Sequence, residues 1–142
     1  MTPHGATRAC RCPRPRPAPG GWLVPPDLGG PRDRRALRGR ARPTATCILF
    51  ALATGESSAW HRLTSEEVWL AHTGTVDLVL GGTGPTPAEG DALTLGPDLA
   101  AGHHPQLLVP AGVWQRTRPV TADALVSCVV SPGFDFEDFE QL

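Results

Sequence analysis

The chain has 142 residues, which is enough for one domain with a hydrophobic core and hardly enough for two. Its net charge of −1 conceals two opposed segments: residues 1–43 carry ten Arg and two acids, whereas 44–142 carry three Arg and twelve acids. No apolar run reaches the ~18 residues that a membrane helix needs, so we expect no membrane partner. The four cysteines lack the spacing of a zinc site or a disulfide framework, which predicts a cytoplasmic location.

Residues 1–43 are rich in Pro, Gly and Arg and have almost no periodic apolar pattern. Such a segment cannot bury enough surface to offset its conformational entropy, so we expect it to be mostly disordered. The exception is 19–24, where Trp22 lies in a pattern typical of a short strand. The Arg tract lacks interleaved aromatic residues, and the rest of the chain is acidic. These features predict no nucleic-acid partner.

Residues 44–142 have the pattern of an all-β domain. Short apolar or alternating runs are separated by Gly, Pro, Asp and Thr, and no long stretch has a helical period. This pattern is typical of a β-sandwich or barrel. The predicted strands are 46–53, 58–63, 67–72, 76–80, 92–95, 106–109, 114–117 and 124–130.

Two spaced motifs lie within this domain. In the first, Gly55, His61, Leu63, Glu67 and Gly74 follow the spacing Gly-x5-His-x-Leu-x3-Glu-x6-Gly. Because side chains alternate along a strand, His61 and Leu63 share one face, while Glu67 and Trp69 share a face of the next strand. A tight turn over 64–66 then brings His61 near Glu67.

The second motif is Pro110-Ala-Gly112-Val-Trp-Gln115. Its Pro and Gly predict a turn that returns the chain and directs Gln115 toward His61 and Glu67. An imidazole, a carboxylate and an amide that converge inside a small barrel would form a polar pocket with an apolar wall that includes Leu63 and Trp69.

The two motifs resemble the paired cupin signatures, with Leu63 and Gln115 at positions where those signatures carry His. Four longer stretches resemble, in order, the cupin-5 family, a domain of unknown function also called DUF985. They are HRLTSEEVW (61–69), LGPDLAAG (95–102), PQLLVPAGVWQ (105–115) and SPGFDFEDFE (131–140). The resemblance implies a cupin-type double-stranded β-helix, a jelly-roll barrel that is usually a homodimer. It also implies that 19–24 is the opening strand of the family. No reaction is generally established for this family.

Three functions remain open from the sequence. The first is binding of a small sugar-like or carboxylated metabolite, with His61 and Glu67 as catalytic groups if a reaction occurs and with Arg62, Trp69 and Gln115 as ligand-binding residues. The second is a metal-dependent isomerase or dioxygenase, in which His61, Glu67 and Gln115 would hold a divalent metal. That set contains only one strong nitrogen donor. The sequence therefore predicts no bound cofactor, and the divalent metal stays an alternative. The third, a nucleic-acid-binding module, is disfavoured by charge.

Each candidate residue also has a structural interpretation. His61 can be a barrel histidine bonded to Glu67 or to a backbone carbonyl. Glu67 can be an ion-pair partner of Arg62 or Arg116, and Gln115 can satisfy buried polar groups. The chain contains no Tyr, which disfavours an isomerase that pairs a His base with a Tyr acid. The sequence leaves open which ligand binds and whether any reaction is catalysed.

Overall fold

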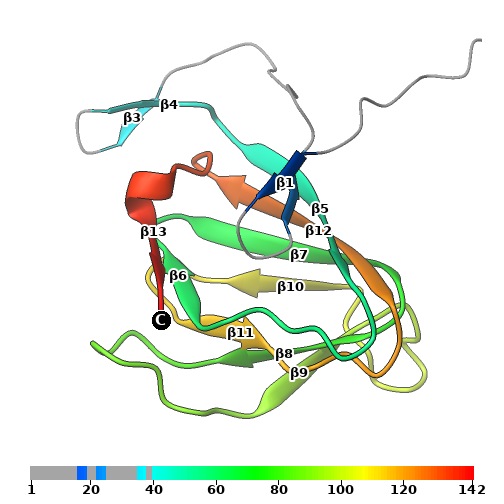
Figure 1. Cartoon of the computed structure of the whole chain (residues 1–142). Helices are drawn as coiled ribbons and strands as arrows, with labels where there is room; N and C mark the ends of the chain where they lie inside the picture. Colours follow the sequence, from blue (N-terminus) through cyan, green and yellow to red (C-terminus); the bar gives the residue numbers. More distant parts are fainter. Residues whose placement is uncertain (1–15, 19–21, 25–34, 38–39) are drawn as a thin grey trace, which may run out of the picture.

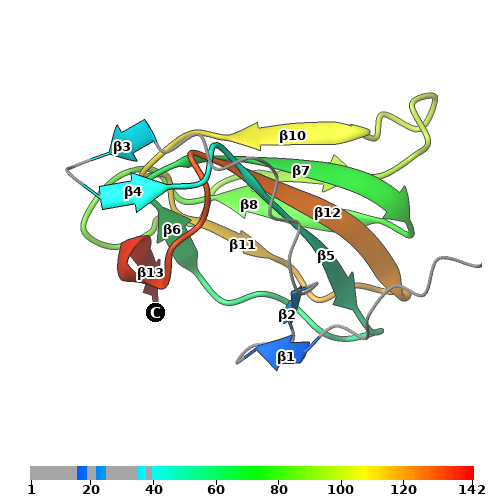
Figure 2. The ribbon, with the colours of Figure 1, turned by 90° about the horizontal axis from the view of Figure 1, so that it is seen from above.

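A computed structural model describes residues 16–18, 22–24, 35–37 and 40–142. In these residues two antiparallel sheets face each other, which confirms the predicted all-β fold (Figures 1 and 2). Among them no helix is long and apolar enough to cross a membrane. The predicted disorder of 1–43 lies mostly outside the described residues.

The first sheet has six strands. Its spatial order is β1 (Arg16–Ala18), β2 (Trp22–Val24), β5 (Thr46–Leu52), β12 (Ala124–Ser131), β7 (Glu66–Thr73) and β10 (Gln106–Val109). The single pairing of Leu23 with Leu49 joins β2 to β5. A β-bulge interrupts the register between β12 and β7 next to Leu125.

The second sheet has five strands, in the order β13 (Phe139–Gln141), β6 (His61–Leu63), β11 (Gln115–Thr117), β8 (Val76–Leu80) and β9 (Ala92–Leu95). A 3-10 helix over Phe136–Asp138 precedes β13. Two short strands, β3 (Arg35–Leu37) and β4 (Arg40–Arg42), pair with each other. Each of the eight predicted strands is present, although β6 begins three residues later than expected.

The core lies between the two sheets because each strand directs alternate side chains inward. Phe50 of β5 meets Trp69 of β7 edge to face, with ring centroids 5.8 Å apart. Leu78, Leu95 and Val126 complete the most deeply buried part. The polar residues of the two motifs lie on the same inner faces as these apolar side chains.

The turn predicted between β10 and β11 is present. Gly112 has φ of +77°, in the left-handed region that favours glycine. Its N–H donates to the Leu63 carbonyl at 2.7 Å, and the Val113 N–H donates to the Pro110 carbonyl at 3.2 Å. The turn thus fixes the start of β11 against the end of β6, which places Gln115 directly opposite His61.

Candidate functional site

Glu67, Gln115 and Trp69 form a hydrogen-bonded chain that crosses from one sheet to the other. The Gln115 Nε2 of β11 donates to Glu67 Oε2 of β7 at 2.5 Å. The indole Nε1 of Trp69 donates to Gln115 Oε1 at 2.9 Å. An indole N–H can only donate, so the Gln115 carbonyl must face Trp69 and its amide nitrogen must face Glu67. The orientation of the Gln115 amide is therefore determined by its two neighbours.

The Glu67 carboxyl is almost completely buried, and burial is the main reason why its pKa rises from 4.5 to about 7. Hydrogen bonds from Gln115, Cys128 and Trp69 oppose this rise. The Cys128 thiol lies beside Glu67, and its pKa is raised by its own burial and then by the Glu67 charge. At neutral pH Glu67 thus populates both protonation states, which suits a proton donor or acceptor.

His61 lies on the inner face of β6 and is 2% exposed. Its Nδ1 lies 2.9 Å from the Ala59 carbonyl oxygen. A carbonyl only accepts, so Nδ1 carries the proton and Nε2 is the acceptor of the neutral ring. Burial lowers the pKa of His61, which keeps the ring neutral, while the bond to Ala59 acts in the opposite direction.

Arg62 lies on the outer face of β6, because it alternates with His61. Its Nε donates to Glu140 Oε2 at 2.7 Å, and its guanidinium lies 4.5 Å from the centroid of the Trp114 ring. The other arginine considered as a partner of Glu67, Arg116, instead donates to Glu89 at 2.7 Å. The structure therefore brings Gln115 together with Glu67, Trp69 and His61 but keeps Arg62 outside this group.

Two inner-face neighbours of the site were not named as site residues in the sequence analysis. Cys128 lies beside Glu67, and the ring of Phe139 lies 5.6 Å from that of His61. The alternation of β12 places Cys128 on the same inner face as Val126 and Val130, so its inward direction was available from the sequence. Its contact with Glu67, which lies on another strand, could not be predicted from the sequence.

The donors of this site do not fit a transition metal. A non-haem iron site normally has two His and one carboxylate, whereas here Leu63 and Gln115 occupy the positions of two imidazoles. Glu67 is engaged by an amide and has a raised pKa, although a metal ligand should be a ready anion. Among the residues that the structure describes, no three His, Cys, Asp or Glu side chains gather as a metal site would require.

Two facing antiparallel sheets, with a Pro-Gly turn that directs a polar side chain inward, define a barrel of the cupin class. The family of the Cupin superfamily designated DUF985 matches residues 17–142. The chain belongs to this family, whose function is unknown, and its match begins well before residue 44. A search of curated proteins finds no match.

Solved structures agree with this assignment. An X-ray structure of a protein from Shewanella oneidensis is 40% identical, with a TM-score of 0.63 over 71% of this chain and 63% of that one. This chain thus spans less than two thirds of the Shewanella protein. A hypothetical protein from Leishmania major is 27% identical, with a TM-score of 0.73 over 89% of this chain and 80% of that one. A dTDP sugar isomerase from Desulfovibrio desulfuricans G20 shares the fold, with 18% identity and a TM-score of 0.59 over 87% of this chain and 81% of that one.

Proposed function

We propose that this protein binds a small sugar-like or carboxylated metabolite inside the barrel, against His61, Glu67 and Gln115. The carrying observation is the Glu67 carboxyl. It is buried with a pKa raised to about 7, and its Oε1 has no well-formed hydrogen bond from any of the described residues. Burying a polar group costs free energy unless it is hydrogen-bonded, so this oxygen suits a ligand hydroxyl or a protonated carboxyl.

The neutral imidazole of His61 is able to accept a proton, and the Glu67 carboxyl, whose pKa is raised to about 7, is able to donate one. If the bound metabolite reacts, these two residues would be the acid and base, and Gln115 would hold Glu67 in place. Trp69 would contribute a wall and the bond that orients Gln115. Arg62 would reach an anionic ligand only by leaving Glu140.

Ligand binding can be tested with isothermal titration calorimetry against glucose 6-phosphate, dTDP-glucose, oxalate and citrate. His61→Ala should weaken binding of any compound that binds the wild type by about 2- to 13-fold, as expected for one lost hydrogen bond, and by more if that compound is charged at the contact. The matched control is His104→Ala, because His104 is exposed in the loop before β10. Equal loss in both variants, or an unaffected affinity in His61→Ala, would refute the assigned site.

We also propose that the protein forms a homodimer in the cytoplasm, through the outer face of the six-stranded sheet. One row across four strands of this face is entirely apolar: Cys47, Val129, Val68 and Leu108. Leu108 of this row is 54% exposed, and Leu49 of the next row is 43% exposed. The outer face of the other sheet instead carries charged pairs such as Arg116 with Glu89. This apolar row favours a second copy of itself, because neither side must desolvate a charge within the row.

A further inference from the structure

The inner site lies under the C-terminal end of the chain. Strand β13 pairs with β6 at the edge of the five-stranded sheet, with Phe139 opposite Leu63 and Gln141 opposite His61. The ring of Phe139 therefore lies on the inner side, 5.6 Å from the His61 ring. Figure 1 shows β13 alongside β6 at one end of the barrel. A ligand that approaches His61 from this end meets residues 134–142, here called the strap.

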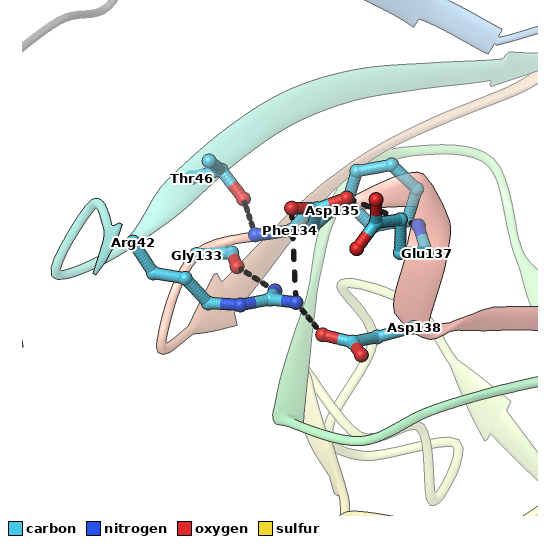
Figure 3. Close-up of polar contacts among 7 residues, drawn as sticks. All are labelled: Arg42, Thr46, Gly133, Phe134, Asp135, Glu137 and Asp138. Atoms are coloured by element: carbon cyan, nitrogen blue, oxygen red, sulfur yellow. Dashed lines mark hydrogen bonds and ion pairs between the residues drawn. The ribbon is translucent and has the colours of Figure 1, made fainter. Parts of the chain in front are cut away.

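The strap is held at its beginning by Arg42, which is only 3% exposed. The guanidinium forms an ion pair with Asp138, lies 3.8 Å from an Asp135 carboxylate oxygen and donates to the Gly133 carbonyl at 2.8 Å. Figure 3 shows the Arg42 side chain extended between this carbonyl and the two carboxylates. A buried charge of this kind depends strongly on its partners, because removal of one partner leaves the other uncompensated.

The rest of the strap is attached by the Phe139 ring, by a part-buried bond from the Phe134 N–H to Thr46 Oγ1 at 2.9 Å, and by exposed contacts of β13. Its strand is only three residues long, and Glu140 is held by Arg62 at an exposed site. The Leu142 N–H donates to the Trp60 carbonyl at 3.0 Å. Exposed ion pairs contribute little to stability, and short terminal edge strands open at low free energy. The buried Arg42 contact is therefore the attachment on which the closed position depends most.

We propose that the strap closes the ligand site, that Phe139 forms one of its walls, and that Arg42 is the positioning residue that sets the strap in its closed position. The class of ligand in this inference rests on the proposed function. The test of the strap itself requires no ligand. Opening would move the 3-10 helix and β13 away from β6 and expose His61 and the interior around Cys128. The apolar ring of Phe139 beside His61 favours a ligand with an apolar face next to its polar groups, as sugars have.

The test measures access to the interior through Cys128, with methyl methanethiosulfonate as the probe and no ligand. Cys10, Cys12 and Cys47 are replaced by Ser in the full chain, so that Cys128 is the remaining thiol. Arg42→Ala should raise the labelling rate about tenfold or more, and Asp138→Asn should raise it less, because Asp135 still faces Arg42. The control Arg118→Ala removes an exposed arginine on the outer face and should leave the rate unchanged.

Hydrogen exchange separates opening of the strap from general unfolding. In Arg42→Ala the amides of β13 should lose protection, while those of β12 and β7 keep theirs. Parallel loss in all three strands, or an unchanged Cys128 labelling rate, would overturn the proposal. If no compound in the calorimetric panel binds but labelling behaves as expected, the strap stands and the proposed ligand class is wrong. If a compound binds in calorimetry but the Cys128 labelling rate does not change in Arg42→Ala, the proposed ligand class stands and the strap is wrong.

Discussion

Gln115 connects the two sheets through Glu67: the Gln115 amide donates to the Glu67 carboxylate at 2.5 Å across the interior of the barrel. The same side chain accepts the indole N–H of Trp69, so its donor and acceptor ends are both used between the sheets. A glutamine at this position of the cupin signature is thus more than a missing metal ligand, because it holds a carboxyl group that burial would otherwise leave poorly solvated.

Replacement of Gln115 by Leu should destabilise the protein by about 2–6 kcal/mol. The substitution removes the bond that Gln115 donates to Glu67 and the bond that it accepts from Trp69, and each buried group left unsatisfied costs about 1–3 kcal/mol. Urea denaturation at pH 7 measures the difference. Gln106→Leu is the matched control, because Gln106 is exposed on β10, and it should change stability by less than about 0.5 kcal/mol. Similar effects of the two variants would show that the Gln115 bonds contribute little.

Glu67→Gln should change how stability depends on pH. The folded-state pKa of about 7 lies above the ordinary value of 4.5, so the folded protein resists ionisation of this group. The group imposes no penalty below about pH 4.5; the penalty grows as pH rises toward 7 and then levels off at a value on the order of 3 kcal/mol. The variant has no such penalty. Its free energy of unfolding should therefore rise relative to wild type between pH 5 and pH 9.

The control for this measurement is Glu66→Gln. Glu66 is exposed on the same strand as Glu67 but on its other face, so its replacement should give a difference from wild type that is nearly constant over pH 5–9. A constant difference for Glu67→Gln as well would mean that the carboxyl titrates as it does in the unfolded chain.

Leu63→His should create metal affinity that the wild type lacks. Leu63 lies on the inner face of β6 with His61, so the variant supplies two imidazoles on the face that carries the proposed site, and with Glu67 they make up the donor set of many iron sites. Elemental analysis after dialysis should find less than one equivalent of transition metal in the wild type and more in the variant. Leu63→Asn is the control for a polar residue without the imidazole. One equivalent of iron, manganese, nickel or zinc in dialysed wild type would contradict the prediction.

Leu108→Glu should dissociate the proposed homodimer. Two copies of the substitution would place charges within an apolar contact, and a like-charge or desolvated pair there costs several kcal/mol. Light scattering across a dilution series should give twice the chain mass for wild type and the chain mass for the variant. Leu99→Glu introduces the same charge at an exposed loop leucine that is not part of the apolar row and should remain dimeric. A monomeric wild type would remove the proposed interface.

Much of the fold could be predicted from the sequence because its determinants are local. Alternation of apolar side chains located the strands from β5 to β12, and Pro110 with Gly112 located the turn that starts β11. The inward direction of His61, Glu67 and Gln115 follows from the same two-residue period. The contact of Arg42, by contrast, could not be predicted from local patterns: its side chain lies just before the predicted domain and is buried against the C-terminal segment.

Local patterns alone determined which residues face inward, and tertiary structure alone determined which of them meet. The hydrogen bond between Gln115 and Glu67 joins positions 48 residues apart, and the bond from Arg42 to Gly133 spans 91. No periodicity relates such distant positions, because their contact depends on how two sheets pack and on where the last strand adds to the edge. The same holds for the raised pKa of Glu67, whose cause is the desolvation that appears only when the barrel closes around it.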